Sequence, residues 1–326
     1  MVSLTTRRRF MLGSVTAPLV ARFAQAQTFP SRPVRIVIGF PPGGGIDILA
    51  RLIAPVMSER IGQPVIVDNR PGANGQIATQ AVAQSEADGH TVLFGTAGNL
   101  AINQVLYPDR PGTNMERDFT PLSLVASLGF VLVVGPSMPA RSFKELIDHA
   151  KPRPGQVFFG SSGKGGLPHL SGELLNLQAS IQTVHVPYRG SAPAFTDLIS
   201  GQVHYVFDAV AIALPYIQAG RIRPLAVTGP TPIAPLPEVP LAKATLPEFE
   251  VVNWYGMVVR SGTSAAMIAR LQQEVAFALR QPAVAERAAS LGLDLLGTTP
   301  EQFAAFQGAE ILKWGRVTKS ANIQID

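Results

Sequence analysis

The sequence predicts an α/β fold, and three observations support that prediction. The chain has 326 residues, which suits about two domains of ordinary size. It is 46% hydrophobic and 15% charged, with 30 glycines and 28 prolines, so it holds more turn residues than a helical bundle needs. After Pro30 a short apolar or β-branched run, a Gly/Pro/Ser-rich loop and an amphipathic segment recur along the chain. Strands that alternate with helices predict parallel sheets covered by helices.

Nine short apolar runs fit β-strands, and helix-like segments separate most of them. Residues 265–280 carry apolar side chains at helical spacing and predict an amphipathic helix of the core. Ligands of such sheets bind beyond the carboxyl ends of the strands, so we expect functional residues in the loops that follow strands. The predicted strands are residues 35–39, 65–68, 91–95, 130–134, 157–160, 183–186, 204–207, 225–228 and 255–259.

Residues 1–26 have the pattern of an export signal. Arginines at positions 7–9 precede an apolar run over residues 10–20. The small-x-small pattern at residues 24–26 then predicts cleavage before Gln27. The arginine run also resembles the twin-arginine export motif, and either export route fits the pattern. The apolar run is shorter than the roughly 20 residues of a membrane-spanning helix, so we expect a signal peptide and a soluble product.

The chain contains no cysteine, which excludes disulfides, thiolate metal sites, a cysteine nucleophile and a lipid-modified cysteine. Its formal net charge is +5, but four arginines lie in the predicted signal and leave 23 basic against 22 acidic side chains. A nearly neutral product does not suit a nucleic-acid partner. No histidine and carboxylate cluster has metal-ligand spacing, so we expect neither a metal site nor a cofactor.

Three stretches of the sequence predict how the chain passes between domains. Residues 119–136 form a long apolar stretch with no helix between its halves, as expected of strands that pass from one lobe to another. Residues 222–229 would form the return. Residues 230–247 hold six prolines and little periodicity, which predicts an extended surface connection.

A glycine-rich loop follows the first predicted strand and precedes a helix, over residues 35–47. Glycines let a backbone approach a ligand closely, and the free amides of a helix N-terminus attract anions. We therefore expect carboxylate or other anion binding here, with a tight turn that requires glycine as the alternative. A dinucleotide site is disfavoured because Ile48 stands where the fingerprint needs its third glycine. Asp47 would brace the loop or complement the helix dipole. The candidate binding residues are Phe40, Pro42, Gly43, Gly44 and Asp47.

Residues 157–169 repeat this design of strand, glycine-rich loop and helix start. Two such loops that face each other across a cleft would hold an anion from both sides. The spacing around Ser162 and Lys164 excludes a phosphate-binding P-loop and a nucleophile elbow. The candidate binding residues are Ser161, Ser162, Gly163 and His169. A serine hydrolase remains an alternative that geometry decides; it would combine Ser161 or Ser162 with His169, His185 or His204 and with Asp208.

Other predicted strand ends also carry polar residues. Thr96, Ala97 and Asn99 offer amides, a hydroxyl and a side-chain amide to an oxygen-rich ligand, and a polar turn is the alternative. Tyr188 and Asp208 follow two later strands. Asp208 would organise the cleft or accept a hydrogen bond from a ligand hydroxyl, an ammonium group or a bound water, and a strand-end cap is the alternative.

An ordered set of short motifs resembles one known family. The motifs are PSRP at 30–33, the glycine loop at 40–47, VDNRPGA at 67–73, ADGHT at 87–91, GSSG at 160–163, HVPYRG at 185–190, GQV at 201–203 and PLAVT at 224–228. Together they resemble the periplasmic substrate-binding proteins of tripartite tricarboxylate transporters, also called Bug receptors. The resemblance covers essentially the whole chain after the predicted signal. It departs from the family at residues 240–245, away from the predicted cleft.

The resemblance implies a periplasmic-binding-protein fold of the type II kind. Two lobes, each with a mainly parallel sheet covered by helices, would close on a ligand cleft between them. We place lobe 1 at residues 27–127 and 227–326, and lobe 2 at residues 128–226.

The same resemblance implies a soluble periplasmic receptor without catalysis. It would capture a small carboxylate, pass it to a two-subunit membrane permease and act as a monomer. A sensor that signals through a membrane kinase would use the same cleft and remains an alternative.

Overall fold

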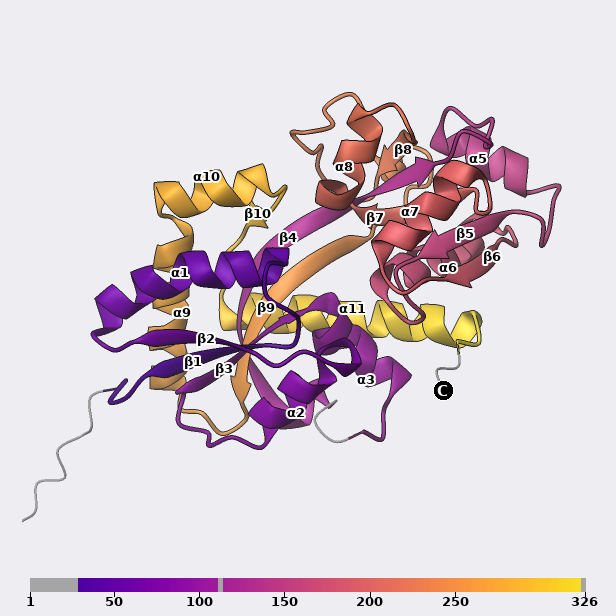
Figure 1. Cartoon of the computed structure of the whole chain (residues 1–326). Helices are drawn as coiled ribbons and strands as arrows, with labels where there is room; N and C mark the ends of the chain where they lie inside the picture. The colour runs from indigo at the N-terminus through magenta and orange to yellow at the C-terminus, as the bar shows by residue number, and fades with distance from the viewer. Residues whose placement is uncertain (1–28, 111–113, 324–326) are drawn as a thin grey trace, which may run out of the picture.

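The computed structural model describes residues 29–110 and 114–323 of the chain. Its strands form one curved, mixed sheet that runs through two lobes, with helices packed on the outside (Figure 1). The predicted signal peptide at residues 1–26 lies outside the described residues. None of the helices described is long and apolar enough to cross a membrane.

The first lobe surrounds strands in the order β2-β1-β3-β9-β4. These are β1 (Val34–Ile38), β2 (Val65–Asn69), β3 (Thr91–Thr96), β9 (Val252–Arg260) and the first part of β4 (Phe119–Val134), with the short β10 (Asp294–Leu295) beside β4. β1 is parallel to β2 and β3, whereas β9 is antiparallel to β3 and β4. Most side chains of β1 are buried because helices cover both faces of the sheet.

The helices of the first lobe cover both faces of its sheet. Side chains of α1 (Gly45–Ile61), α9 (Ala265–Leu279) and α10 (Pro282–Ser290) share one apolar core on one face. The other face is covered by α2 (Gln76–Ala83), η2 (Gly98–Ile102) and α11 (Pro300–Ser320). The short η1 (Ala73–Gly75), α3 (Asn103–Leu106) and α4 (Met115–Asp118) complete the lobe.

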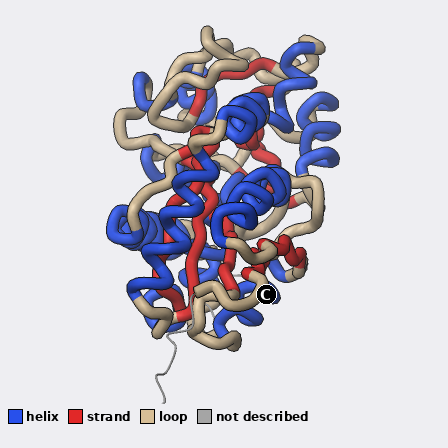
Figure 2. Tube along the Cα trace, turned by 90° about the vertical axis from the view of Figure 1, so that its left-hand side faces the viewer, coloured by secondary structure: helices blue, strands red, loops and turns tan. Residues whose placement is uncertain are grey.

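The second lobe continues the sheet in the order β4-β7-β5-β6. Its strands are β5 (Phe158–Ser161), β6 (Val184–Pro187), β7 (Tyr205–Ala209) and β8 (Arg223–Val227), and its helices are α5 (Phe143–Ala150), α6 (Leu167–Ala179), α7 (Ser191–Ser200) and α8 (Val210–Gln218). β5 is parallel to β6 and β7, and β4 is antiparallel to β7 and β8. Helices flank the strands of both lobes (Figure 2).

β4 joins the two lobes as a single strand of 16 residues. Its residues 119–129 pair with β9, and residues 130–134 pair with β7. The apolar stretch expected to pass between lobes is therefore one continuous strand. Because β4 and β9 cross between lobes in opposite directions, the sheet is mixed rather than mainly parallel. The lobe boundaries placed near residues 127 and 227 stay a prediction.

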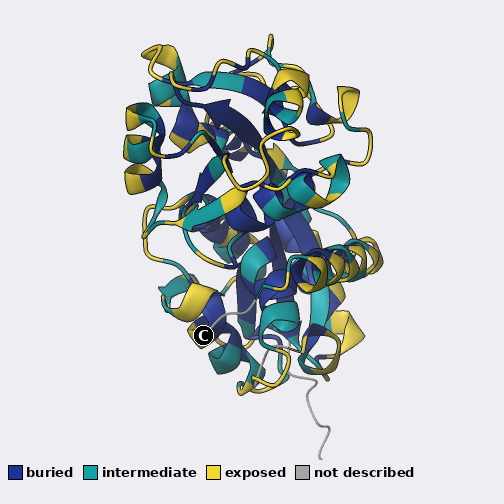
Figure 3. Cartoon of the chain, turned by 90° about the vertical axis from the view of Figure 1, so that its right-hand side faces the viewer, coloured by how far each residue is buried: buried dark blue, intermediate teal, exposed yellow. Residues whose placement is uncertain are grey.

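α11 packs across both lobes, against β4 and η2 on one side and α6 on the other (Figure 1). Its buried Glu310 accepts hydrogen bonds from the indole nitrogens of Trp254 and Trp314, each at 3.0 Å. Lys313 forms an ion pair with the same carboxylate. The strands are buried beneath helices whose outer faces are exposed (Figure 3). α11 thereby ties the crossing strand β9 to the core shared by both lobes.

The proline-rich connection over residues 230–247 contains a single 3₁₀ turn, η3 (Ala242–Ala244). Most of its residues are exposed, as expected of a surface connection, while the side chains of Ile233 and Leu236 are buried and join the apolar core of the second lobe. A side chain at Gly129 of β4 would come within 2.8 Å of Ile233. Glycine at this crossing point lets the connection lie directly on the strand.

Candidate functional site

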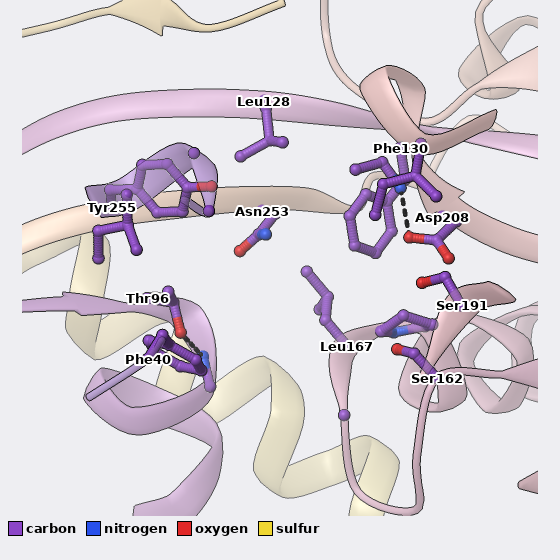
Figure 4. Close-up of a pocket in the computed structure, with 18 of the residues that line it drawn as sticks. Phe40, Thr96, Leu128, Phe130, Ser162, Leu167, Ser191, Asp208, Asn253 and Tyr255 are labelled. Atoms are coloured by element: carbon purple, nitrogen blue, oxygen red, sulfur yellow. Dashed lines mark hydrogen bonds between the residues drawn. The ribbon is translucent and has the colours of Figure 1, made fainter. Parts of the chain in front are cut away.

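A cavity of about 320 Å³ lies between the lobes, beyond the carboxyl ends of β1, β3, β5 and β7 (Figure 4). Phe40, Gly44, Gly45, Ile46, Asn74, Thr96 and Gly98 line it from the loops of the first lobe, and Leu128, Phe130, Asn253 and Tyr255 line it from the crossing strands. Ser162, Gly166, Leu167, Pro168, Ser191, Asp208, Ala209 and Ile212 line it from the second lobe. Both glycine-rich loops therefore reach the same cavity.

The helices α1 and α6 begin at this cavity with nearly the same backbone conformation. The N-cap residues Gly44 and Gly166 have φ/ψ of −76°/163° and −75°/163°. The residues before them, Gly43 and Gly165, have φ of 90° and 76°, which is left-handed backbone that favours glycine. Neither N-cap has a side chain that caps the helix. The first amides of both helices are thus left for a ligand.

Each loop is braced by the side chain three residues after its N-cap. The Gly43 amide donates to Asp47 Oδ2 at 2.9 Å, and the Gly165 amide donates to His169 Nδ1 at 3.0 Å. The two braces join corresponding positions of the two loops. They hold the left-handed glycine in place, so the amides that follow it keep their direction.

Asp47 is part of an ionised network behind the first loop. Arg51 Nε donates to both of its oxygens at 3.0 and 3.1 Å, and Asn69 Nδ2 donates to Oδ1 at 2.9 Å. Burial by itself raises the pKa of Asp47, but the hydrogen bonds from Arg51, Gly43 and Asn69 outweigh burial and the pKa lies below its ordinary value. The first brace is therefore a carboxylate whose charge is neutralised by Arg51.

His169 belongs to a cluster of stacked and hydrogen-bonded side chains behind the second loop. Its ring stacks on His185 with the centroids 3.6 Å apart, and His185 Nε2 lies 2.6 Å from the Ser161 hydroxyl. Burial lowers the pKa of His185 to about 3, and the nearby His169 and Lys164 act in the same direction. Because His169 Nδ1 accepts a hydrogen bond from an amide, that nitrogen carries no proton.

The Ser161–His185 pair gives a serine hydrolase little support. Ser161 is fully buried and does not line the cavity, so a substrate has no access to its hydroxyl. Within the described part of the chain, no carboxylate forms a hydrogen bond or ion pair with His185. Ser162 does line the cavity but forms no hydrogen bond with a histidine among the same residues. The pair instead supports the loop that precedes α6.

Two more predicted residues make hydrogen bonds behind the cavity wall. Asn99 is buried and accepts from the Thr96 amide at 2.8 Å, while its own amide donates to Thr79 at 3.0 Å. The Tyr188 hydroxyl donates to Asp197 at 2.7 Å. Both side chains fix the course of loops whose neighbours, Thr96 and Ser191, line the cavity.

Asp208 lines the cavity from the end of β7 and is only 3% exposed. Its Oδ1 accepts from the Ala209 amide at 2.8 Å, whereas its Oδ2 is buried and has no hydrogen-bond partner among the described residues. Burial raises the pKa of Asp208 to about 6, and the neighbouring Ser191 hydroxyl and the Ala209 amide offset part of the rise.

Tyr255 places a hydroxyl at the other end of the cavity (Figure 4). Burial raises its pKa to about 12, so the hydroxyl stays protonated and remains a hydrogen-bond donor. A Cβ atom at Gly45 would lie 2.9 Å from this hydroxyl. Glycine is therefore needed at the start of α1 for β9 and the helix to approach each other.

The structure divides the predicted binding residues into two groups. Phe40, Gly44, Thr96, Ser162 and Asp208 line the cavity. The others, Pro42, Gly43, Asp47, Ala97, Asn99, Ser161, Gly163, His169 and Tyr188, do not line it and lie in or behind the same loops. Contact between any of them and a ligand stays a prediction.

Several lining residues were not foreseen. Asn253 and Tyr255 lie in the first half of β9 rather than after a strand, and no local signal in the sequence distinguishes them. Asn74 and Ser191 each lie one residue beyond a motif singled out in the sequence, so a wider window around those motifs would have included them. Among the described residues, no lysine, arginine or histidine lines the cavity and no group of histidine, aspartate and glutamate is arranged to hold a metal ion.

One family model and several related proteins match this chain over most of its length. The model of the tripartite tricarboxylate transporter family receptor matches residues 49–323. A Pseudomonas protein described as a UPF0065 protein in the tcbD-tcbE intergenic region is 40% identical over 315 residues, 95% of this chain and 93% of that protein.

Solved structures agree with this match. Rpa4515 from R. palustris with adipate has a TM-score of 0.77 and 37% identity, and the alignment covers 91% of this chain and 99% of that chain. The periplasmic binding protein BugD has a TM-score of 0.73 and 29% identity, with the same coverage. These likenesses confirm the two-lobed periplasmic-binding-protein fold expected from the sequence, and the resemblance from which it was drawn.

Proposed function

The chain belongs to the tripartite tricarboxylate transporter receptor family, and from that premise we propose that it is a periplasmic protein that captures a small carboxylate in the cavity between its lobes. It delivers the ligand to a membrane permease with one large and one small subunit. The exported chain acts as a soluble monomer and catalyses no reaction. The adipate held by Rpa4515, which shares this fold, supports a carboxylate as the ligand class.

The observation that carries the proposal is the convergence of two uncapped helix N-termini on one cavity. The amides that follow Gly44 and Gly166 come from opposite lobes, and the positive ends of the α1 and α6 dipoles both favour an anion. A carboxylate that bridges the two ends would hold the lobes together. Ligand capture is therefore coupled to closure of the cleft.

The cavity wall between the two helix ends favours an organic acid over an inorganic anion. Leu128, Phe130, Leu167 and Ile212 supply apolar surface in this part of the wall. Apolar surface gives no favourable contact to a phosphate or sulfate, but it packs well against a hydrocarbon chain.

The first test is a thermal-shift and calorimetric screen of the purified protein with carboxylates, sugars, phosphates and nucleotides. A ligand present at 100 times its dissociation constant stabilises the fold by about 2.7 kcal/mol, which such a screen detects. We expect a shift with one series of carboxylates only. Stabilisation by nucleotides or sugars alone, or no response to any acid, would contradict the proposal.

A matched pair of variants tests where the ligand binds. Ile212 is 43% exposed and lines the cavity, whereas Ile77 is 52% exposed and does not. Ile212→Glu places a negative charge at the cavity and should weaken carboxylate binding at least tenfold, while Ile77→Glu should leave binding unchanged. Equal effects of the two variants would place the ligand elsewhere. Delivery is tested by uptake of labelled ligand into cells that carry the permease, with and without this protein.

A further inference from the structure

One polar atom of the cavity is left unused by the protein itself. Asp208 is only 3% exposed, and its Oδ2 atom has no hydrogen-bond partner among the described residues. The Ala209 amide bonds the other oxygen at the start of α8, so a strand-end cap explains Oδ1 and leaves Oδ2 unexplained. A buried acceptor without a donor is unfavourable, and one that faces a binding cavity can take its donor from a bound molecule.

The cavity holds no side-chain cation that would neutralise this carboxylate. Asp208 is the one acidic residue among the described lining residues, and no basic residue is among them. It forms no ion pair with any described lysine, arginine or histidine. The Ser191 hydroxyl lies beside it in the cavity wall and lowers the pKa of Asp208, but Oδ2 has no hydrogen-bond partner among the described residues (Figure 4). A donor group on the ligand can therefore fill this position.

The two ends of the cavity differ in chemistry. Phe40 and Thr96 lie at one end with the N-terminus of α1, and Asp208 and Ser191 lie at the other, with Asn253 between them (Figure 4). The α1 end offers amide donors with no acidic side chain in the cavity wall, so it favours a carboxylate. The other end combines the amides at the start of α6 with the buried carboxylate of Asp208, which is an acceptor. A second carboxylate placed there would face a like charge, and one of the two groups would have to take up a proton.

We propose that the ligand is asymmetric, with a carboxylate at the α1 end and a hydrogen-bond donor, an ammonium group in the tightest ligands, against Asp208 Oδ2. This assignment rests on the proposed function and names its substrate class. An ammonium group satisfies the acceptor and neutralises the charge at once, whereas a hydroxyl does only the first. Burial that raises the pKa of Asp208 to about 6 in the ligand-free protein agrees with a charge that lacks its partner.

The test is a calorimetric series of probes matched in length. Succinate, glutarate and adipate are compared with 4-aminobutyrate, 5-aminopentanoate and 6-aminohexanoate, and with the corresponding hydroxy acids, at pH 7.5. We expect the best amino acid to bind at least tenfold more tightly than the diacid of equal length, with the hydroxy acid between them. In Asp208→Asn the amino acid should lose at least tenfold in affinity, and the order should reverse. Asp148→Asn, at an exposed acid of the same lobe, is the control and should change nothing.

The pH dependence of the unmodified protein gives an independent readout that needs no variant. Between pH 7.5 and 5.5 the affinity for a diacid should rise, because protonated Asp208 then donates to the second carboxylate. The affinity for the amino acid should fall over the same interval. Diacids that bind most tightly, with the same affinity at both pH values and in Asp208→Asn, would overturn the assignment and leave the proposed function intact. No binding by any compound would overturn both.

Discussion

The loop between β1 and α1 and the loop between β5 and α6 share a backbone course but are braced by different chemistry. In both, a left-handed glycine precedes a glycine N-cap, and the amide of the first glycine donates to a side chain four residues later. Asp47 is the acceptor in the first lobe and His169 in the second. The comparison teaches that glycine placement sets the backbone, and that any acceptor of suitable reach holds it.

The two braces should respond differently to substitution. Asp47 keeps its charge because Arg51 and Asn69 satisfy it, and it accepts from the Gly43 amide as well. His169 accepts from the Gly165 amide alone, and its Nε2 lies 3.6 Å from Glu173. Replacing Asp47 should therefore lower the free energy of unfolding more than replacing His169.

Among the substitutions considered, Asp47→Ala should lower the stability of the protein the most. It leaves the Gly43 amide, Arg51 and Asn69 without their shared acceptor, and we expect a loss of about 3 kcal/mol in the free energy of unfolding at pH 7, measured with urea. Asp47→Asn keeps one acceptor oxygen and should lose less.

The effect of Asp47→Ala should also depend on pH in a defined direction. The folded-state pKa lies below the ordinary value, so this stabilisation is fully present above about pH 4 and is lost as pH falls further. No loss of stability in either the alanine or the asparagine variant would show that Asp47 braces nothing.

Asp208→Asn should have the next largest effect on the free energy of unfolding, and it should raise the stability rather than lower it. The raised pKa means that the folded protein binds the Asp208 proton more tightly than the unfolded chain, so its stability falls as pH rises from about 4 to above 6. Removing the charge should raise the free energy of unfolding of the ligand-free protein by about 2 kcal/mol at pH 7.5, with no gain at pH 4. A variant that is destabilised at pH 7.5 would contradict the unpaired buried charge.

The smallest effect concerns His169. An asparagine at position 169 places an oxygen near the position of Nδ1, whereas a glutamine does not. His169→Gln should therefore lower the free energy of unfolding by about 1 kcal/mol more than His169→Asn. Hydrogen exchange at the Gly165 amide should be fast in the glutamine variant and slow in the asparagine variant. Equal exchange rates at the Gly165 amide in the two variants would contradict the hydrogen bond from Gly165 to residue 169.

Much of the fold followed from periodicity in the sequence. Most predicted strands match observed ones within about two residues, and α9 falls on the amphipathic pattern over residues 265–280. Such patterns are readable because each buried face repeats at the spacing of its own element. The long pairing of β4 with β9 was harder to foresee, because it joins segments more than 100 residues apart.

For the site, the sequence alone located both glycine-rich loops and the strand end that carries Asp208, because glycines and strand ends are marked by local sequence; the anion preference of the helix starts stays a prediction. Only the tertiary structure decided which side chains line the cavity. It turned Asp47, His169 and Tyr188 to the supporting side, where they bond neighbouring groups, and brought Asn253 and Tyr255 in from within a strand. The direction of a side chain depends on what packs against its element, and that partner is distant in sequence.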